Sequence, residues 1–433
     1  MKIIENPSQN IWSELIKRPL QNYETIETTV KLIFKEIATK GDAAVLKYTN
    51  LFDGVKLTDL KATKEEISEA DQLVSAELKA AIQLAKRNIE SFHIAQKTDP
   101  VAIETMPGVR CWLEKKPIQK VGLYVPGGSA PLFSTVLMLA IPAQLAGCKE
   151  IVLCTPPDKT GKINPAILYA AQICGVTTII KSGGIQAIAA MALGTETIPK
   201  VYKIFGPGNQ FVTCAKQFAT QFGTAIDMPA GPSELLVFAD KTANASFVAA
   251  DLLSQAEHGK DSQVVLVTTD QLFLNKAVSE ITKQLENLSR KAIIKEALQN
   301  ARFIYLEKET DALDFINEYA PEHFIICARN AALFTEGIQN AGSVFVGNYT
   351  PESAGDYASG TNHTLPTNGF SKSYSGVNLD SFLKTISFQQ ITAAGIQNIG
   401  ESIAVMAEAE GLDAHKNAVS IRIKTIQNEA NGD

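Results

Sequence analysis

Four of the five histidines have a carboxylate or an amide nearby in the sequence that could share a site with them. In LLSQAEHG, a helix would place Gln255 and His258 three positions apart on one face, so both side chains could bind one object. Gly259 suits the end of such a helix. The same spacing is also typical of a solvated polar helix end. The fifth histidine, His93, has a helical context that predicts an exposed side chain without a role.

Asp356 and His415 could complete a metal site with that pair. Asp356 lies in SAGDYASG, where small neighbours would let the backbone approach a ligand, although such an aspartate is also a common turn-former. His415, in AHKNA, could equally lie on a helix surface. Two imidazoles, one carboxylate and one amide oxygen are a suitable donor set for Zn²⁺. Spacing alone does not distinguish this site from four polar residues in separate loops.

Glu322 and His323 follow Pro321 in YAPEHF and are candidates for acid–base chemistry. Alcohol oxidation needs a base that accepts the hydroxyl proton as hydride leaves, and histidine titrates near neutral pH. A carboxylate beside it could activate water. Adjacent side chains diverge on a strand, but both could reach a cleft where a helix meets a strand. A solvated Glu–His pair would have the same sequence.

Two glycine-bearing turns could bind the phosphates of a nucleotide. VGLYVPGGSAP and KIFGPGN each contain a predicted strand and precede a predicted helix, a setting in which backbone N–H groups bind phosphate. The chain has no GxGxxG motif, so neither turn matches the dinucleotide fingerprint. The nucleotide signal is therefore weaker than the histidine signals.

Two series of alternating strands and helices must position these residues. The first hundred residues have helical periodicity, as in 30–40 and 64–96. From about Lys120, short apolar strands alternate with helices, which predicts βαβ units, a parallel sheet and ligands at the carboxyl ends of its strands. The helices of this first series are expected at 133–147, 165–174, 186–193 and 210–220.

A second series predicts a second α/β domain, joined to the first near 229–233. Its helices are expected at 245–257, 272–285 and 312–319. The polar segment 347–375 is long enough to indicate a functional or a disordered segment. The tail from Asp380 regains helical periodicity and then predicts a short strand in VSIRIK. The fold class is therefore α/β, with two Rossmann-like parallel-sheet domains and helical N-terminal and small C-terminal segments.

The composition excludes several classes of function. The chain has 433 residues, and its net charge of −6 gives no support for binding to nucleic acids or membrane surfaces. The start, MKIIENPSQNIW, lacks the apolar stretch of a signal peptide, and no apolar run reaches the roughly 18 residues of a membrane span. Six scattered cysteines without a CxxC pair indicate free thiols in a reduced, cytoplasmic protein.

Seven blocks, in order along nearly the whole chain, resemble the histidinol dehydrogenase family. They are GLYVPGGSAPLFSTVLMLAIPA, KIFGPGNQFVTCAK, DMPAGPSE, LLSQAEHG, YAPEHF, GDYASGTNHTLPT and AEAEGLDAHKNA. The resemblance implies one Zn²⁺ per subunit, with the ligands Gln255, His258, Asp356 and His415. It also implies that Glu322 and His323 are the catalytic pair.

The resemblance extends to substrate and cofactor. The metal ligands and His323 are expected to contact the substrate together with Ser233, His363 and Glu410. NAD is expected along Tyr124, Gln186 and Asn209. This chain departs from the family pattern at none of these positions.

The family's architecture implies an intertwined homodimer in which the tail of one subunit, with Glu410 and His415, completes the site of the other. The expected segments are an N-terminal helical arm (1–20), an α/β domain with the metal and catalytic residues (21–118 plus 232–378), an NAD-binding Rossmann-like domain (119–231) and a C-terminal dimerisation segment (379–433).

The resemblance implies a four-electron oxidation of L-histidinol through L-histidinaldehyde to L-histidine, with two NAD, at the end of histidine biosynthesis. His323 would accept a proton in each oxidation, and Glu322 would activate water to hydrate the aldehyde. A thioester through Cys111 or Cys148 is disfavoured because nothing nearby in the sequence activates a thiol.

Three other functions compete with this one. A related dehydrogenase could act on another alcohol such as a sulfonated diol, but His363 and Glu410 favour an imidazole substrate. A zinc hydrolase with Glu322 as the water base would not need the strand–helix series around 124–209. A binding protein without activity would not need an intact Glu322–His323 pair.

Overall fold

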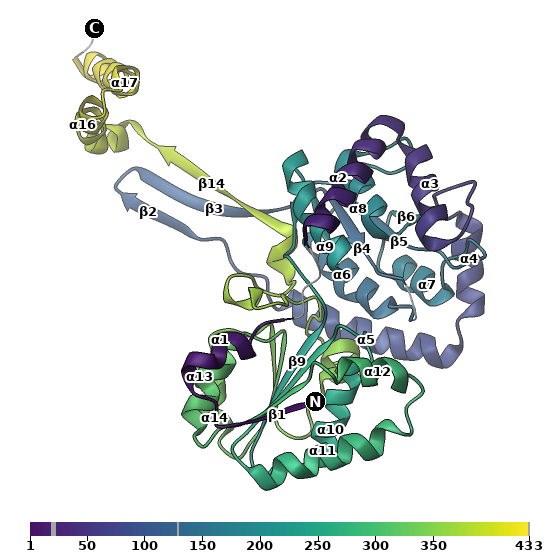
Figure 1. The fold of residues 1–433 in the computed structure, drawn as a ribbon. Helices are drawn as coiled ribbons and strands as arrows, with labels where there is room; N and C mark the ends of the chain where they lie inside the picture. Colours follow the sequence, from purple (N-terminus) through teal and green to yellow (C-terminus); the bar gives the residue numbers. More distant parts are fainter. Residues whose placement is uncertain (19–22, 128–129, 432–433) are drawn as a thin grey trace. The chain divides into compact units, whose positions relative to one another are not determined.

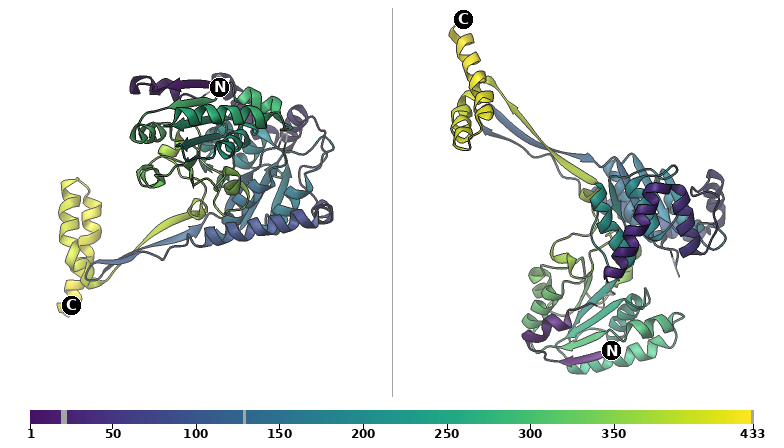
Figure 2. Two further views of the ribbon diagram at one scale, coloured as in Figure 1. Left: turned by 90° about the horizontal axis from the view of Figure 1, so that it is seen from below. Right: turned by 45° about the horizontal axis from the view of Figure 1, so that its top comes forward.

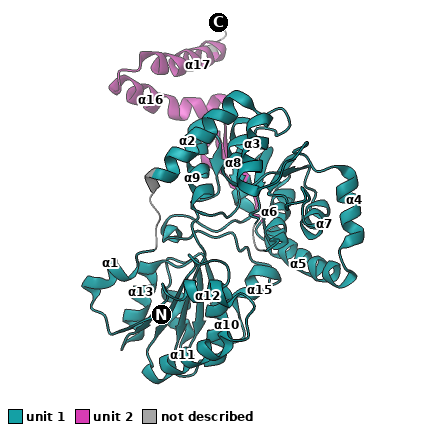
Figure 3. Ribbon diagram, turned by 45° about the vertical axis from the view of Figure 1, so that its right-hand side comes forward, with its two compact units in different colours: residues 1–96, 118–382 teal, residues 97–117, 383–433 magenta. Residues whose placement is uncertain are grey.

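The computed structural model (Figures 1 and 2) describes residues 1–18, 23–127 and 130–431. The expected boundary between residues 20 and 21, and Gly128 and Ser129 of the VPGGSAP turn, lie outside the described residues. The chain divides into two compact units, coloured separately in Figure 3. Unit 1 comprises Met1–Gln96 and Ile118–Phe382, and unit 2 comprises Lys97–Pro117 and Leu383–Asp433.

A six-stranded parallel sheet in unit 1 contains the predicted second series of strands. Its order is β1-β11-β10-β9-β12-β13. The strands are β1 (Lys2–Glu5), β9 (Glu234–Ala239), β10 (Gln263–Thr268), β11 (Arg302–Tyr305), β12 (His323–Cys327) and β13 (Ser343–Val346). β9, β10 and β12 are buried along their whole length, as a sheet covered by helices on both faces requires.

Helices cover both faces of this sheet (Figure 1). On one face lie α10 (Ala245–Ala256), α11 (Gln271–Leu285) and α12 (Lys291–Ala297). On the other lie α1 (Trp12–Leu15), α13 (Glu309–Tyr319) and α14 (Ala331–Gly337). The sequence predicts α10, α11 and α13 within a few residues, but not β1, because that strand depends on pairing with β11 rather than on its own pattern.

A five-stranded parallel sheet, also in unit 1, contains the predicted first series. Its order is β6-β5-β4-β7-β8. The strands are β4 (Lys120–Tyr124), β5 (Glu150–Thr155), β6 (Thr178–Lys181), β7 (Lys203–Phe205) and β8 (Ala225–Ile226). The four helices expected from the sequence between these strands are present as α6 (Phe133–Ala146), α7 (Pro165–Ile173), α8 (Gly184–Leu193) and α9 (Gln210–Ala219).

Four helices from the first hundred residues complete the two layers around this sheet. They are α2 (Tyr23–Lys40), α3 (Asp42–Asp53), α4 (Lys64–Leu73) and α5 (Ala76–Ile94). α2 and α3 share a core with α8 and α9, whereas α4 and α5 share one with α6 and α7. The sequence assigns 21–118 to the domain of 232–378, but the contacts of these helices differ from that assignment. Their periodicity predicts an apolar face without indicating which sheet that face covers.

Unit 2 consists of an antiparallel sheet and a helical hairpin. The sheet contains β2 (Ala102–Met106), β3 (Val109–Pro117) and β14 (Leu383–Ile391), with β3 in the centre. α16 (Ala393–Ala409) and α17 (Asp413–Asn431) lie side by side (Figures 1 and 2).

The prediction for the tail is wrong in two places. β14 is a strand where helical periodicity was expected, and VSIRIK lies within α17 instead of forming a strand. Alternating apolar residues suit a strand, but Val419 and Ile423 are also four apart on a helix. Both pack so closely against Gly400 of α16 that a Cβ at that position would clash with them, so the hairpin uses them as a helical face.

The polar segment 347–375 is ordered; along the chain it follows β13 and precedes β14. It contains the short helix α15 (Glu352–Tyr357) and the 3₁₀ turn η3 (Phe370–Lys372), and it buries Asn362, Thr364 and Thr367. Among the described helices, none is both long enough and apolar enough to cross a membrane.

Candidate active site

The Glu322–His323 pair lies at the amino end of β12, beside the first residue of β9. Both residues are almost fully buried, at 6% and 4% exposed, so the pair is not a solvated one. The sequence predicts ligands at the carboxyl ends of parallel strands, whereas this pair lies at the opposite end of the sheet. The reason is local. α13 ends at Tyr319 and β12 begins at His323, so only a short turn separates them and the pair lies where the strand starts.

The backbone of Glu234 holds both side chains. Its N–H donates to Oε2 of Glu322 at 2.8 Å, and its carbonyl oxygen accepts from Nδ1 of His323 at 3.1 Å. Because a carbonyl oxygen only accepts, Nδ1 carries the proton and the lone pair is on Nε2. Nε2 is buried and has no hydrogen-bond partner in the described parts of the chain. The imidazole is therefore arranged as a base with its reactive nitrogen free.

The environment shifts the protonation of both groups. Burial lowers the pKa of His323, and the charge of Asp356 acts against this. Burial raises the pKa of Glu322 well above its ordinary value, while the N–H of Glu234 acts against this. The neutral imidazole is the form that accepts a proton, and a raised pKa makes the Glu322 carboxylate a stronger base when it is ionised.

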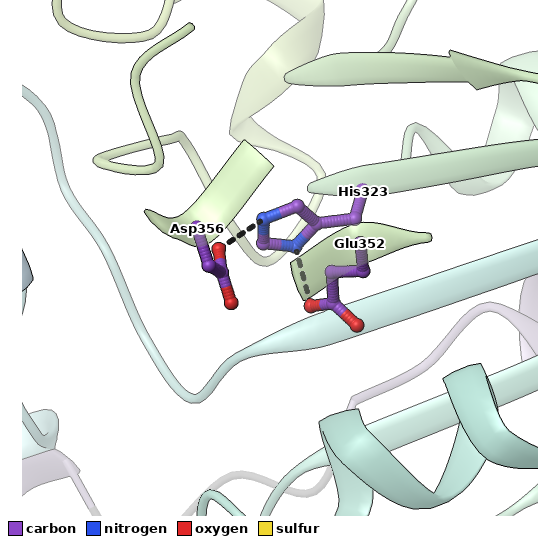
Figure 4. Close-up of side chains that lie close together, drawn as sticks. All are labelled: His323, Glu352 and Asp356. Atoms are coloured by element: carbon purple, nitrogen blue, oxygen red, sulfur yellow. Dashed lines mark ion pairs between the residues drawn. The ribbon is translucent and has the colours of Figure 1, made fainter. Parts of the chain in front are cut away.

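α15 places two carboxyl groups on opposite sides of the imidazole (Figure 4). Oδ1 of Asp356 is 3.8 Å from Nε2, and Oε1 of the buried Glu352 is 3.4 Å from Nδ1. Glu352 is not among the site residues predicted from the sequence. Its position four residues before Asp356 puts both on one helix face, but six residues of helix leave too short a pattern to recognise.

His323, Glu352 and Asp356 also have potential ligand atoms within 4.8 Å of one another. The ring lies between the two carboxyl groups, and its Nδ1 is already bonded to a carbonyl oxygen. An ion on Nε2 would therefore lie on the side of Asp356, away from Glu352. This geometry suits a hydrogen-bonded base better than a three-ligand metal site.

Gln255 is the strongest candidate ligand that the structure offers in addition to Asp356. It lies in the last turn of α10, which packs against α15, and its side chain is fully buried. Neither amide atom has a hydrogen-bond partner among the described residues. Burying an amide without a partner is costly, so this arrangement points to a ligand that the amide would bind.

His258 and His363 face the same centre. α10 ends at Ala256, before Gly259, so His258 follows the helix instead of sharing its face with Gln255. It is nevertheless close enough to lower the pKa of His323 and of His363 through its charge. Nδ1 of His363 donates to the carbonyl oxygen of Asp356 at 3.0 Å, and its Nε2 lies 3.2 Å from Oγ1 of Thr135.

The remaining predicted substrate residues lie in different places. Ser233 is half-buried directly before β9, where its carbonyl oxygen accepts the N–H of Gln263 at 3.0 Å. Glu410 caps α16, and His415 lies in α17; both side chains are exposed and belong to unit 2.

The three predicted NAD residues lie at the carboxyl ends of three strands: Tyr124 is the last residue of β4, Gln186 follows β6 and Asn209 follows β7. The Tyr124 hydroxyl accepts the N–H of Gly184 at 3.1 Å, and burial raises its pKa to about 12. Gln186 is fully buried, with both amide atoms unpartnered in the described chain. Asn209 caps α9 by accepting two backbone N–H groups. The strand order reverses between β4 and β7, where α/β sheets bind ligands.

Asp53, at the end of α3, is a further polar residue near Tyr124 that the sequence does not indicate. Its Oδ2 is buried without a partner among the described residues, and its charge raises the pKa of Tyr124. Burial raises the pKa of Asp53 itself to about 6. Only the tertiary fold brings α3 to this strand end.

Replacing this carboxyl should change how stability depends on pH. With its pKa raised from 3.8 to about 6, the folded protein binds the proton more tightly than the unfolded chain, so the wild type loses stability as pH rises from about 4 to about 6. Asp53→Asn should abolish this contribution. Thermal unfolding at pH 4.5 and 7.5 should show the variant a few degrees more stable, relative to the wild type, at the higher pH only; a constant difference would contradict the shift.

Two parallel sheets with helices on both faces, and a buried Glu322–His323 pair, are features of an α/β enzyme. At the level of fold alone, the chain is similar to an acetylating aldehyde dehydrogenase from Geobacillus thermoglucosidasius, with a TM-score of 0.50 at 15% identity over 88% of this chain and 94% of that one. A family model described as "Histidinol dehydrogenase" matches residues 16–423. The chain belongs to the histidinol dehydrogenase family, whose members are oxidoreductases.

Individual relatives agree with this membership. The chain is 57% identical over 427 residues to the histidinol dehydrogenase of Bacteroides thetaiotaomicron, covering 99% of this chain and 100% of the relative. It is 50% identical over 420 residues to that of Escherichia coli O6:H1, covering 96% of each. The crystal structure of histidinol dehydrogenase from Elizabethkingia anophelis has a TM-score of 0.96 at 57% identity, over 99% of both chains.

Proposed function

We propose that this protein oxidises L-histidinol through L-histidinaldehyde to L-histidine with two NAD, at the end of cytoplasmic histidine biosynthesis. Family membership supports the reaction. The single structural observation that carries it is the buried His323, with a proton on Nδ1 and an unpartnered Nε2 among the described residues. A base of this kind is what oxidation of an alcohol needs.

In the proposed reaction, His323 accepts the hydroxyl proton through Nε2 while NAD supplies the hydride acceptor. Glu322 takes a proton from the water that hydrates the aldehyde, and His323 accepts a proton again in the second oxidation. Ser233, His363 and the partner's Glu410 orient the substrate. The aldehyde exists until water adds to it between the two oxidations. A buried site that retains the aldehyde during this interval prevents its loss.

Zn²⁺ would be held by Gln255, His258, Asp356 and the partner's His415. The residues of unit 1 fit this group, because the Gln255 amide is buried without a partner among the described residues and the set combines nitrogen and oxygen donors. The ion would supply a fixed positive centre that binds and orients the substrate's nitrogen atoms.

Loss of the predicted tail ligand should remove metal. His415→Asn deletes an imidazole ligand from an exposed helix position, so the fold should survive. The zinc affinity should fall by about 100-fold or more, and activity with it. Metal content after dialysis against a graded zinc buffer measures this, with Lys416→Asn as a neighbouring control. Full zinc content in His415→Asn would sink the assignment of this ligand.

A homodimer with shared sites is part of the proposal. Unit 2 has little core of its own and exposes apolar side chains, among them Val405 at 60% and Met406 at 65%. An apolar surface of this kind is typical of an interface with another chain. Within such a dimer, the tail of one subunit would complete the site of the other.

Subunit mixing tests the shared site. Inactive His415→Asn subunits and inactive His323→Asn subunits, once exchanged, should form mixed dimers in which one site has all of its residues. A random mixture should recover up to about a quarter of the wild-type activity, because half of the dimers are mixed and each has one intact site of two. No recovery after proven subunit exchange would favour sites within one chain.

The direct test of the substrate uses a matched pair of amino alcohols. The purified zinc-loaded protein should reduce NAD with L-histidinol but not with L-phenylalaninol, which has a ring of similar size without imidazole nitrogens. Equal rates with both would mean that the site does not recognise the imidazole. No NADH from either would contradict the proposed reaction.

A further inference from the structure

Glu234 connects the catalytic pair to the rest of the protein. Its backbone N–H and carbonyl oxygen bond Glu322 and His323 respectively, so the position of this one residue sets both side chains. The carboxylate of Glu234 is 2% exposed and takes no part in these two bonds. What fixes that carboxylate therefore also fixes the acid–base pair.

Arg18, from the N-terminal arm, forms a bidentate ion pair with this carboxylate. Nε donates to Oε1 at 3.0 Å, and Nη2 donates to Oε2 at 2.9 Å. The Arg18 side chain is only 9% exposed. The backbone N–H of Asn368 donates to Oε1 as well, at 2.8 Å, so the polar segment after α15 meets the same carboxylate. A buried bidentate arginine–carboxylate pair fixes the orientation of both side chains, which a single hydrogen bond does not.

Arg18 also holds the chain that leads into Glu322. Nη2 donates to the carbonyl oxygen of Tyr319 at 2.7 Å, and the guanidinium lies 3.8 Å from the centre of the Tyr319 ring. The next residue, Ala320, has a φ of 53°, a conformation that residues other than glycine rarely adopt. The guanidinium therefore binds two segments next to the catalytic pair: Glu234 at the start of β9, and Tyr319 at the end of α13, three residues before Glu322.

We propose that Arg18 is a positioning residue for the acid–base pair, acting through the carboxylate of Glu234 and the carbonyl oxygen of Tyr319. Arg18 does not contact the reacting groups itself. Its loss leaves Glu322 and His323 chemically intact but free to shift relative to the substrate, and shifts of about 1 Å can lower the rate about 100-fold. The inference rests on the proposed catalytic roles of Glu322 and His323.

Arg302 provides a matched control. It holds the same arm by donating to the carbonyl oxygens of Leu15 and, at 2.7 Å, Lys17, but it has no hydrogen bond to Glu234. Arg18→Met should lower kcat by about 10- to 100-fold with little change in the KM for L-histidinol or in zinc content. Arg302→Ala removes these contacts to Leu15 and Lys17 but leaves the Arg18–Glu234 pair in place, so kcat should stay within about threefold of the wild type. Arg18→Lys keeps the positive charge but cannot form the bidentate pair, so it should give an intermediate kcat.

Two further variants separate positioning from instability and from error in the catalytic assignment. Arg18→Met/Glu234→Gln removes both buried charges, so it should fold as stably as the wild type and still have a lowered kcat. Full kcat in this folded double variant, or equal losses in Arg18→Met and Arg302→Ala, would overturn the inference. Full kcat in His323→Asn would overturn the catalytic assignment and this inference together, whereas full kcat in Arg18→Met beside an inactive His323→Asn would overturn only the role of Arg18.

Discussion

His323→Asn should lower kcat for L-histidinol oxidation by about 1,000-fold, the size expected when a general base is removed. The amide nitrogen of asparagine can still donate to the carbonyl oxygen of Glu234, as Nδ1 does in the wild type at 3.1 Å. Nothing in asparagine replaces Nε2, the nitrogen that has no partner among the described residues. The substitution therefore removes the proton acceptor while retaining the bond that orients it.

The same substitution at a second buried histidine controls for the loss of an imidazole. His93 also has Nδ1 beside a backbone carbonyl oxygen, that of Ile89 at 2.9 Å, and lies in α5 outside the proposed site. His93→Asn should lower thermal stability and leave kcat within a few-fold of the wild type. Steady-state rates at saturating NAD and zinc measure both variants. If His323→Asn kept more than a tenth of kcat, His323 could not be the base.

Glu322→Gln should lower the rate of L-histidine formation by about 100-fold. The glutamine carbonyl oxygen can still accept the N–H of Glu234, which Oε2 accepts at 2.8 Å in the wild type. An amide cannot take a proton from water, so hydration of the aldehyde loses its base. The reduction of L-histidinaldehyde by NADH needs no added water and should lose much less activity.

Comparison of the two directions in one preparation separates these effects. The rate of NADH formation from L-histidinol and the rate of NADH consumption with L-histidinaldehyde are measured for the wild type, Glu322→Gln and Glu322→Asp. The aspartate variant retains a base at a greater distance and should fall between the other two. Equal losses in both directions in Glu322→Gln would argue against a role in water activation.

Local patterns predict most of the strands in both parallel sheets, but not β1, β8 or β13. Short apolar strands separated by helices predict βαβ units, and α6, α7, α8 and α9 lie within a few residues of their expected positions. α6 is an instructive case, because it is buried almost all round and its sequence has no polar face. Its position between two predicted strands therefore identifies α6 as a helix, whereas amphipathic periodicity does not.

The elements that the sequence misses depend on distant partners. β3 pairs with β2 on one side and, on the other, with β14, whose Leu383 lies opposite Pro117, and β1 becomes a strand by pairing with β11. His93 is buried, contrary to the prediction, because its ring packs near Asn362 of the polar segment, 3.4 Å away. No local pattern contains these contacts.

The candidate site divides in the same way. The histidines and their neighbouring carboxylates could be selected by chemical type, and Glu322, His323, Asp356 and His363 do converge. Glu234 and Arg18 could not be selected, because the roles of their side chains exist only after the arm, β9 and β12 have come together. Glu352 is likewise brought to His323 by the packing of α15 against α10.

The most direct test of the proposed reaction is the number of NADH formed per L-histidinol consumed, before and after chelation and zinc add-back, with an aldehyde trap present. The proposal predicts two NADH per substrate, no trapped aldehyde, loss of the reaction with chelator and recovery with zinc. One NADH per substrate, with stoichiometric trapped aldehyde, would mean a simple alcohol dehydrogenase and would contradict the role of Glu322. An unchanged rate after proven removal of zinc would contradict the metal site.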